Sequence, residues 1–189
     1  VLPILGGAPN VWNVAMVFFQ ATLLGGYCYA HILSTRFSLR WQVRIHLAVM
    51  AAGALFLPFA VPPGAAPPPS GGQALWQISM MAGAIGLPFF ALSANAPLLQ
   101  RWFSHTSHPS AHDPYFLYAA SNIGSMASLL LYPIALEPLI GVRDQSSYWA
   151  FGYLALIAAI GAASIFAAPA KQAHSAPAAA NAAPRLGQN

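Results

Sequence analysis

The chain has 189 residues, of which 58% are hydrophobic and 5% are charged, whereas soluble domains carry roughly 25% charged residues. This composition excludes an ordinary soluble domain and predicts an integral membrane protein. The net charge of +4 comes from seven Lys and Arg residues spread along the chain, so the sequence lacks the basic patch of a nucleic-acid-binding protein.

Apolar runs long enough to cross a bilayer recur along the chain, and one crossing needs about 20 residues. They predict an all-α bundle of about five transmembrane helices, at about 11–33, 41–61, 74–99, 114–139 and 147–168. Residues 1–168 then form one transmembrane domain, and the Ala- and Pro-rich residues 169–189 form a flexible tail. Pro88 and Pro97 predict kinks in the third helix. The Pro- and Gly-rich stretch from Pro62 to Gly72 is predicted to be non-helical.

Positive charges predict the orientation, because cytoplasmic loops of membrane proteins are enriched in Lys and Arg. With the N-terminus outside and the C-terminus inside, Arg143 is the only basic residue left on the outer side. The other six lie on the inner side: Arg36, Arg40, Arg44, Arg101, Lys171 and Arg185. The tryptophans agree with these helix ends, where amphipathic rings favour the interface; they are Trp12, Trp41, Trp76, Trp102 and Trp149.

Small residues mark faces on which helices can approach one another closely. Four of them lie at i, i+3, i+4 and i+7 on the fourth predicted helix: Ser121, Gly124, Ser125 and Ser128. Gly26 and Ala30 repeat the same kind of spacing on the first helix. Such faces serve either packing within the bundle or contact with a partner subunit, and the sequence leaves both readings open.

Polar residues in apolar helices call for an explanation, because polar groups inside a bilayer are costly. Arg101 is interpreted as a residue that extends its guanidinium to the headgroups; the alternative is an ion pair with Asp113. Asp113 itself precedes Pro114 and is predicted to cap the fourth helix. Asn122 is predicted to hydrogen-bond with another helix, at Asn95 or Asn13, and a polar substrate pocket is the alternative.

Glu137 is the one acidic residue within a predicted span, near the outer end of the fourth helix. It is interpreted as an interfacial carboxylate in contact with water, and a cation or proton site is the alternative.

Six histidines raise the question of metal or cofactor binding. His105, His108 and His112 lie in one polar loop, which favours a solvated segment over a metal site. His31 and His46 lie near the inner ends of neighbouring helices and are weak candidates for ligating a haem or magnesium tetrapyrrole. No metal and no cofactor is predicted, with tetrapyrrole or lipid as minor alternatives. The only cysteine is Cys28, and no nucleotide-binding loop or catalytic set is recognisable, so the chain is expected not to be an enzyme.

Several blocks of the sequence together resemble a known family. They are LGGAPNVWNVAMVFFQATLLGGYCYAH, LPFFALSANAPLLQRWF, DPYFLYAASNIGS and YPIALEP, between about Leu2 and Tyr153. They look like the membrane, transporter-like domain of bacterial spermidine-synthase-like, or polyamine aminopropyltransferase-like, membrane proteins. The resemblance implies a multi-pass protein of the bacterial cytoplasmic membrane. In that family a cytoplasmic nucleotide-binding-like domain follows the helices, and this sequence has no counterpart to it. The resemblance therefore implies no catalytic residue here.

These observations lead to three functional hypotheses. The first is a non-enzymatic accessory or scaffold subunit that docks on a larger membrane complex, of which a respiratory or photosynthetic complex is one example. The second is a transport module for a small cation or polyamine-like solute that uses Glu137, Asn122 and Asn95. The third is the membrane half of a spermidine-synthase-like enzyme whose catalytic domain is absent from this chain.

Overall fold

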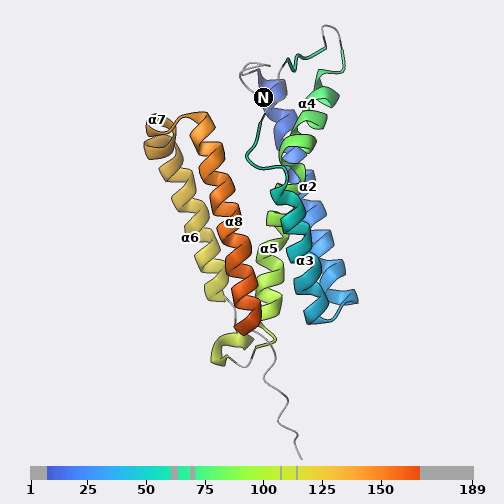
Figure 1. Cartoon of the computed structure of the whole chain (residues 1–189), viewed down its shortest axis with the longest axis vertical. Helices are drawn as coiled ribbons and strands as arrows, with labels where there is room; N and C mark the ends of the chain where they lie inside the picture. The colour runs from blue at the N-terminus through green and yellow to red at the C-terminus, as the bar shows by residue number, and fades with distance from the viewer. Residues whose placement is uncertain (1–7, 61–63, 69–70, 107, 114, 167–189) are drawn as a thin grey trace, which may run out of the picture.

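The computed structural model describes residues 8–60, 64–68, 71–106, 108–113 and 115–166. This part of the chain folds into helices without β-strands, which confirms the predicted all-α class (Figure 1). The helices are α2 (Pro9–Arg36), α3 (Leu39–Ala54), α4 (Gln73–Met81), α5 (Leu87–Phe103), α6 (Tyr115–Leu131), α7 (Glu137–Leu139) and α8 (Val142–Phe166). Shorter elements are the π-helical η1 (Ala82–Gly86) and η3 (Tyr132–Leu136) and the 3₁₀ turn η2 (Pro109–His112). The predicted tail at 169–189 lies outside the described residues.

Four helical segments are long and apolar enough to cross a membrane. They are Pro9–Arg36, Gln73–Phe103, Tyr115–Leu139 and Val142–Ser164. The second and third of these are continuous because η1 joins α4 to α5 and η3 joins α6 to α7. The described chain is therefore compatible with a multi-pass membrane protein.

The second predicted span is shorter than expected. We predicted a helix over about 41–61, but α3 ends at Ala54 and has 16 residues, or about 24 Å of helix. That length falls short of a hydrocarbon core of about 30 Å. Pro58 lies four residues after the end of α3; it lacks a backbone donor and disfavours helix at the residue before it. The chain continues beyond α3 in a non-helical segment, and Phe59 packs its ring 4.6 Å from that of Trp149.

The last helix begins earlier than predicted. We expected it to start near Ser147, with Arg143 and Asp144 in the preceding loop, but α8 starts at Val142. Asp144 therefore lies in the first turn, where a carboxylate interacts favourably with the positive end of the helix dipole.

The predicted kinks correspond to a change of helix type rather than to a break. Helix α5 runs through Pro97 without interruption, whereas the π-helical η1 immediately precedes Leu87 and Pro88. A proline cannot supply the i+4 donor to the carbonyl four residues before it, and its ring crowds that carbonyl. A π-helical turn lets a carbonyl bond to the residue at i+5 instead, which keeps the span helical. The same arrangement recurs at η3, which immediately precedes Glu137 and Pro138.

Helix α5 lies at the centre of the packed part of the molecule (Figure 1). It packs against α2 and α3, while α4 packs against α2 and α8 packs against α3. The starts of α2, α4 and α8 lie at one end of the molecule, and α2, α5 and α8 finish at the other (Figure 1). In contrast, α6 makes few contacts with any other helix.

The hydrophobic core joins α2, α3, α5 and α8. Its members are fully or nearly fully buried: Ala30, Leu33, Met50, Ala91, Ala94, Leu98, Trp102, Tyr153 and Ile160. One polar contact reinforces it, since the Tyr153 hydroxyl on α8 donates to the backbone oxygen of Met50 on α3 at 3.1 Å. The alanines in this set keep the helix backbones close, as expected for a bundle in lipid.

Gly26 allows the closest approach between α2 and α5. A Cβ atom at this position would meet the hydroxyl of Ser93, come within 2.9 Å of the Ser93 Cβ and within 3.0 Å of the Phe90 backbone oxygen. Gly26 and Ala30, which the sequence marked as a small-residue pair, are both buried. A larger residue at Gly26 therefore has to push the two helices apart.

Replacing Gly26 with leucine is expected to destabilise the protein by about 1–3 kcal/mol, because an overpacked contact must relax by moving backbone. Thermal unfolding in mild detergent would show this as a lower midpoint. Gly152→Leu on α8 is the matched control, since a Cβ there meets nothing within 4 Å. Equal midpoints for the two variants would contradict the close α2–α5 contact.

Candidate functional site

Polar side chains from three helices meet inside the bundle. They are Tyr29 on α2, Gln42 and His46 on α3, and Asn95 and Trp102 on α5, and we call them the buried polar cluster. His46 is completely buried, and Gln42, Asn95 and Trp102 are each at most 8% exposed. In a chain with so few charged residues, this cluster is the largest gathering of polar groups in the described core.

Helical periodicity places the members of the cluster. Gln42 and His46 are one turn apart on the buried face of α3, which continues through Met50 and Gly53. Asn95 and Trp102 are two turns apart on the buried face of α5. Because α3 and α5 run in opposite directions, Gln42 on α3 meets Trp102 on α5, and His46 meets Asn95.

Gln42 ties α3 to both of its neighbours. The Trp102 indole Nε1 donates to Gln42 Oε1 at 2.9 Å. Gln42 Nε2 in turn donates to the backbone oxygen of Phe37, in the turn between α2 and α3, at 2.7 Å. One amide therefore satisfies an indole and fixes the turn that leads into its own helix.

His46 and Asn95 form the deeper contact of the cluster. His46 Nε2 lies 2.7 Å from Asn95 Oδ1, so the neutral imidazole donates to the amide oxygen when its proton is on Nε2. The imidazole is flanked by aromatic rings, with centroids 6.0 Å away at both Tyr29 and Trp102. Hydrogen bonds between membrane helices contribute about 0.6 kcal/mol on average and up to about 1.7 kcal/mol.

Three buried polar atoms of the cluster have no hydrogen-bond partner among the described residues: the Tyr29 hydroxyl, His46 Nδ1 and Asn95 Nδ2. A buried polar atom without a partner costs about 1–3 kcal/mol. The cluster thus has unused bonding capacity, but it holds no charged group and no nucleophile paired with a base. Its geometry supports specific pairing of α3 with α5 more directly than it supports catalysis.

The predicted partner of Asn95 was wrong. We expected Asn95 to bond with Asn122, or Asn122 to bond with Asn13, but Asn95 bonds with His46. Asn13 and Asn122 are both exposed, on α2 and α6. The error has a geometric cause: α6 does not pack on the face of α5 that carries Asn95, which is occupied by α3.

The two weak tetrapyrrole candidates do not share a site. His46 is enclosed between α3 and α5, with one ring nitrogen engaged by Asn95. His31 is exposed on α2. The structure therefore offers no pair of imidazoles that face a common cofactor at these positions.

Arg101 and Asp113 lie at the end where α5 finishes. Arg101 is exposed, as the headgroup interpretation requires, whereas its neighbour Trp102 turns inward to Gln42 instead of lying at the interface. Asp113 Oδ1 accepts a long hydrogen bond of 3.4 Å from the backbone N–H of Tyr115, the first residue of α6, and its capping role stays a prediction.

The candidates on the α6 side of the molecule are all exposed. They are Ser121, Asn122, Gly124, Ser125, Ser128 and Glu137. Among the described residues, the Ser128 hydroxyl bonds only within its own helix, to the Gly124 backbone oxygen at 2.9 Å. The structure thus separates Asn122 and Glu137 from Asn95, which is buried on α5.

The histidine loop shows local bonding. His105 Nδ1 lies 2.7 Å from the backbone oxygen of Arg101, and His108 Nδ1 accepts from the Ser110 backbone N–H at 3.2 Å. Within the described ranges, no three His, Cys, Asp or Glu side chains are grouped so that they could hold a metal ion.

Sequence reasoning missed four polar residues that link helices: Gln42, Trp102, Gln77 and Tyr153. Gln77 Nε2 on α4 donates to the backbone oxygen of Val11 on α2 at 2.8 Å. A signal for Gln42 was present, because Gln42, His46, Met50 and Gly53 follow the i, i+4, i+8, i+11 spacing of one helix face. For Gln77, no comparable signal identifies a backbone oxygen as its partner.

Comparisons with protein-family models, with curated proteins and with solved structures give no match. The resemblance to the membrane domain of spermidine-synthase-like proteins therefore stays a prediction.

Replacing His46 or Asn95 alone with leucine is expected to lower stability by about 1–3 kcal/mol, because each leaves the other side chain buried without its partner. The double replacement is expected to cost less than the sum, by about 0.6–2 kcal/mol, since it removes both polar groups. Unfolding free energies of the four proteins in detergent give this coupling energy. His31→Leu, at an exposed position, should leave stability unchanged, and strictly additive effects at positions 46 and 95 would contradict the contact.

Proposed function

We propose that this chain is a non-enzymatic accessory subunit of a larger complex in the bacterial cytoplasmic membrane, and that it docks through α6. The observation that carries the proposal is the exposure of α6, because none of its 17 residues is buried. The most apolar stretch of the whole segment Tyr115–Leu139 likewise contains no buried residue. A helix that the described part of its own chain leaves uncovered is available to another chain.

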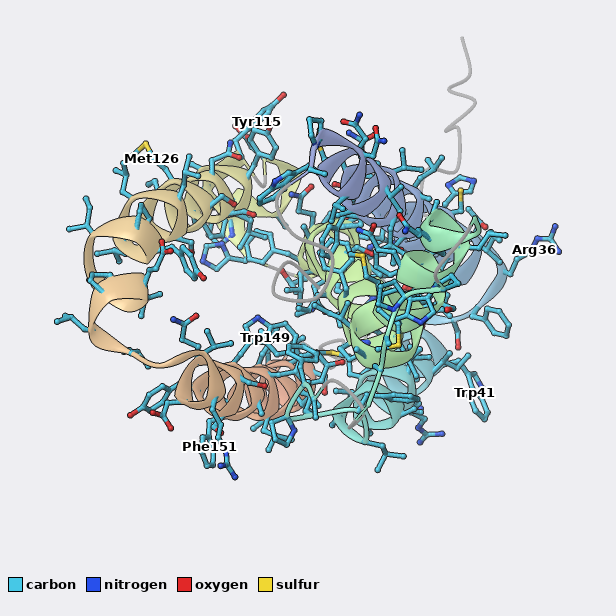
Figure 2. The ribbon with its side chains drawn as sticks, turned by 90° about the horizontal axis from the view of Figure 1, so that it is seen from above. Arg36, Trp41, Tyr115, Met126, Trp149 and Phe151 are labelled. Atoms are coloured by element: carbon cyan, nitrogen blue, oxygen red, sulfur yellow. The ribbon has the colours of Figure 1, made fainter. Side chains whose placement is uncertain are left out.

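The contrast with the other candidate spans supports this proposal. Helix α2 buries Phe18, Gly26, Ala30 and Leu33, and α5 buries seven residues, whereas no residue of α6 is fully buried. Figure 2 shows Tyr115 and Met126 pointing away from the rest of the molecule. Lipid would satisfy exposed Leu, Ile and Met side chains as well as a protein partner does.

Lipid does not satisfy the polar residues of α6. Asn122 is exposed about 10 Å along the segment from its start, and an amide that faces hydrocarbon without a hydrogen bond is costly. Next to it runs the small-residue stripe, Ser121, Gly124, Ser125 and Ser128, on which another helix can come close enough to bond with Asn122. We therefore infer that the partner is a transmembrane helix with a complementary polar residue.

The positions of the basic residues support the proposed orientation. The turn between α2 and α3, with Arg36 and Arg40, and the end of α5, with Arg101, lie at the same end of the molecule (Figure 1). Arg143, at the start of α8, lies at the opposite end. Under the positive-inside rule the first end is cytoplasmic and the N-terminal end of α2 is outside.

A transport role is the weaker proposal. It required Glu137, Asn122 and Asn95 to act together, but Asn95 is buried against His46 while the other two are exposed on α7 and α6. The membrane half of a longer enzyme would also be compatible with the uncovered helix, and its partner would then be part of that enzyme.

Replacing Gly124 with leucine should dissociate the complex without destabilising the chain, because a Cβ at Gly124 meets nothing within 4 Å in the isolated fold. The test is blue native electrophoresis of native membranes solubilised in mild detergent. Wild type and the matched control Gly152→Leu should migrate in a complex larger than the 19.9 kDa chain, and Gly124→Leu should lose that complex.

A complex that survives Gly124→Leu, or a wild-type chain that migrates alone, would contradict docking through α6. Co-purification of a tagged with an untagged copy distinguishes a second copy of this chain from a different subunit. The thermal midpoint of Gly124→Leu, expected to equal that of wild type, separates lost docking from lost folding.

A further inference from the structure

An open groove lies at the end of the molecule where α2, α4 and α8 begin. Its volume is about 1010 Å³, at the upper limit of the usual range for small-molecule sites. Its walls come from α2, the segment after α3, the α4–η1 stretch and the first two turns of α8. The groove is therefore built from elements far apart in the sequence, on the side of the bundle away from the buried polar cluster.

The lining changes from polar to apolar along the groove. Arg143 and Gln145 line one end, near the start of α8. Apolar side chains, among them Phe19, Met81, Ile85 and Trp149, make up most of the rest, which also includes Ser146 and Ser147. Trp149 points toward the other helices in Figure 2, whereas Phe151 points away. The Trp149 ring is held in place by Phe59 at 4.6 Å and by stacking on Tyr153 at 5.4 Å.

The depth of these residues can be taken from the helix rise of 1.5 Å per residue. Trp149 lies six residues beyond Arg143, or about 9 Å along α8. Met81 lies eight residues into α4 and Phe19 ten residues into α2, or about 12 Å and 15 Å. Because α2 and the Gln73–Phe103 span are longer than a hydrocarbon core of about 30 Å, part of this length lies in the headgroup region, and the groove extends from the membrane surface into the outer half of the core.

The groove has one polar, positively charged end at the interface and an apolar floor within one leaflet. This combination matches the shape and polarity of a glycerophospholipid. Arg143 is exposed and is the only charged residue that lines the described groove. The neighbouring polar groups are already used within the protein: Gln145 Nε2 donates to Ile140 O at 2.7 Å and the Ser146 hydroxyl to Phe59 O at 3.1 Å. The guanidinium is therefore the group that selects the headgroup, and its charge favours an anionic phosphate.

We propose that this groove binds one anionic glycerophospholipid, with the phosphate at Arg143 and an acyl chain along Trp149, Met81 and Phe19. The bound lipid fills the space between α8 and the α2–α4 pair. It also covers apolar side chains that no other element of the described chain covers. This site is separate from α6 and does not depend on the docking function proposed for that helix.

Native mass spectrometry of the delipidated protein in detergent, titrated with phosphatidylglycerol or with phosphatidylcholine of the same acyl chains, tests the proposal. Wild type should bind one phosphatidylglycerol more tightly than phosphatidylcholine. Arg143→Gln should weaken phosphatidylglycerol binding about fivefold, the effect of one basic residue near an anionic headgroup, and leave phosphatidylcholine unchanged. Arg36→Gln, an exposed arginine at the opposite end, is the matched control and should behave as wild type.

A second variant tests the apolar part of the groove. Ala84 lines it, and Ala84→Phe should fill the space and weaken both lipids equally. Equal binding of the two lipids by wild type, or unchanged phosphatidylglycerol binding by Arg143→Gln, would overturn the proposal. Unchanged binding by Ala84→Phe with a wild-type thermal midpoint would do the same. Displacement of the lipid by soluble glycerol 3-phosphate would show that the headgroup alone is the ligand and would also overturn it.

Discussion

Helix α5 meets its two main neighbours, α2 and α3, through one very close approach and one buried hydrogen bond. On the α2 side, Gly26 leaves no space between its backbone and Ser93. On the α3 side, His46 and Asn95 meet at 2.7 Å inside the bundle. Moving α2 outward would open the first contact and moving α3 outward would open the second, so both helices are positioned relative to α5. The positions of α4, which continues into α5, and of α8, which leans on α3, follow from this central packing.

Membrane bundles cannot rely on the hydrophobic effect to hold helices together, since lipid is as apolar as the side chains. This chain uses close approach and hydrogen bonds in its place. Each of the contacts between α2, α3, α4 and α8 described above contains a polar link to a backbone oxygen or a side-chain amide: Gln77 to Val11, Gln42 to Phe37, and Tyr153 to Met50. Helix α6 has no such link to another helix among the described residues, and it is also the helix that packs least.

The helical class and the approximate limits of most helices could be predicted from the sequence, because a membrane-spanning helix needs an apolar run as long as the hydrocarbon core is thick. The end of α3 at Ala54 was harder to predict, because the residues after it remain apolar and only Pro58 marks the change. Of the candidate site, Asn95 and His46 were both singled out, but for different partners. A sequence pattern gives the face of a helix on which a residue lies, whereas its partner depends on which helix covers that face. Gly26 and the alanines of α5 decide which helices pack on α5, because these small residues let helix backbones approach closely and add no polar contact.

The π-helical turn η1 has a consequence for how the third span works as a unit. Residues before it, such as Gln77, are bound to α2, and residues after it, such as Asn95, are bound to α3. A turn that closes at i+5 takes up an extra residue, so it changes the rotation of the face after it relative to the face before it. The third span therefore consists of two helical parts with separate rotational phases. Insertion or deletion of a residue within Ala82–Gly86 would rotate the face that carries Gln77 relative to the face that carries Asn95. The length of this short segment is therefore a constraint on the whole bundle.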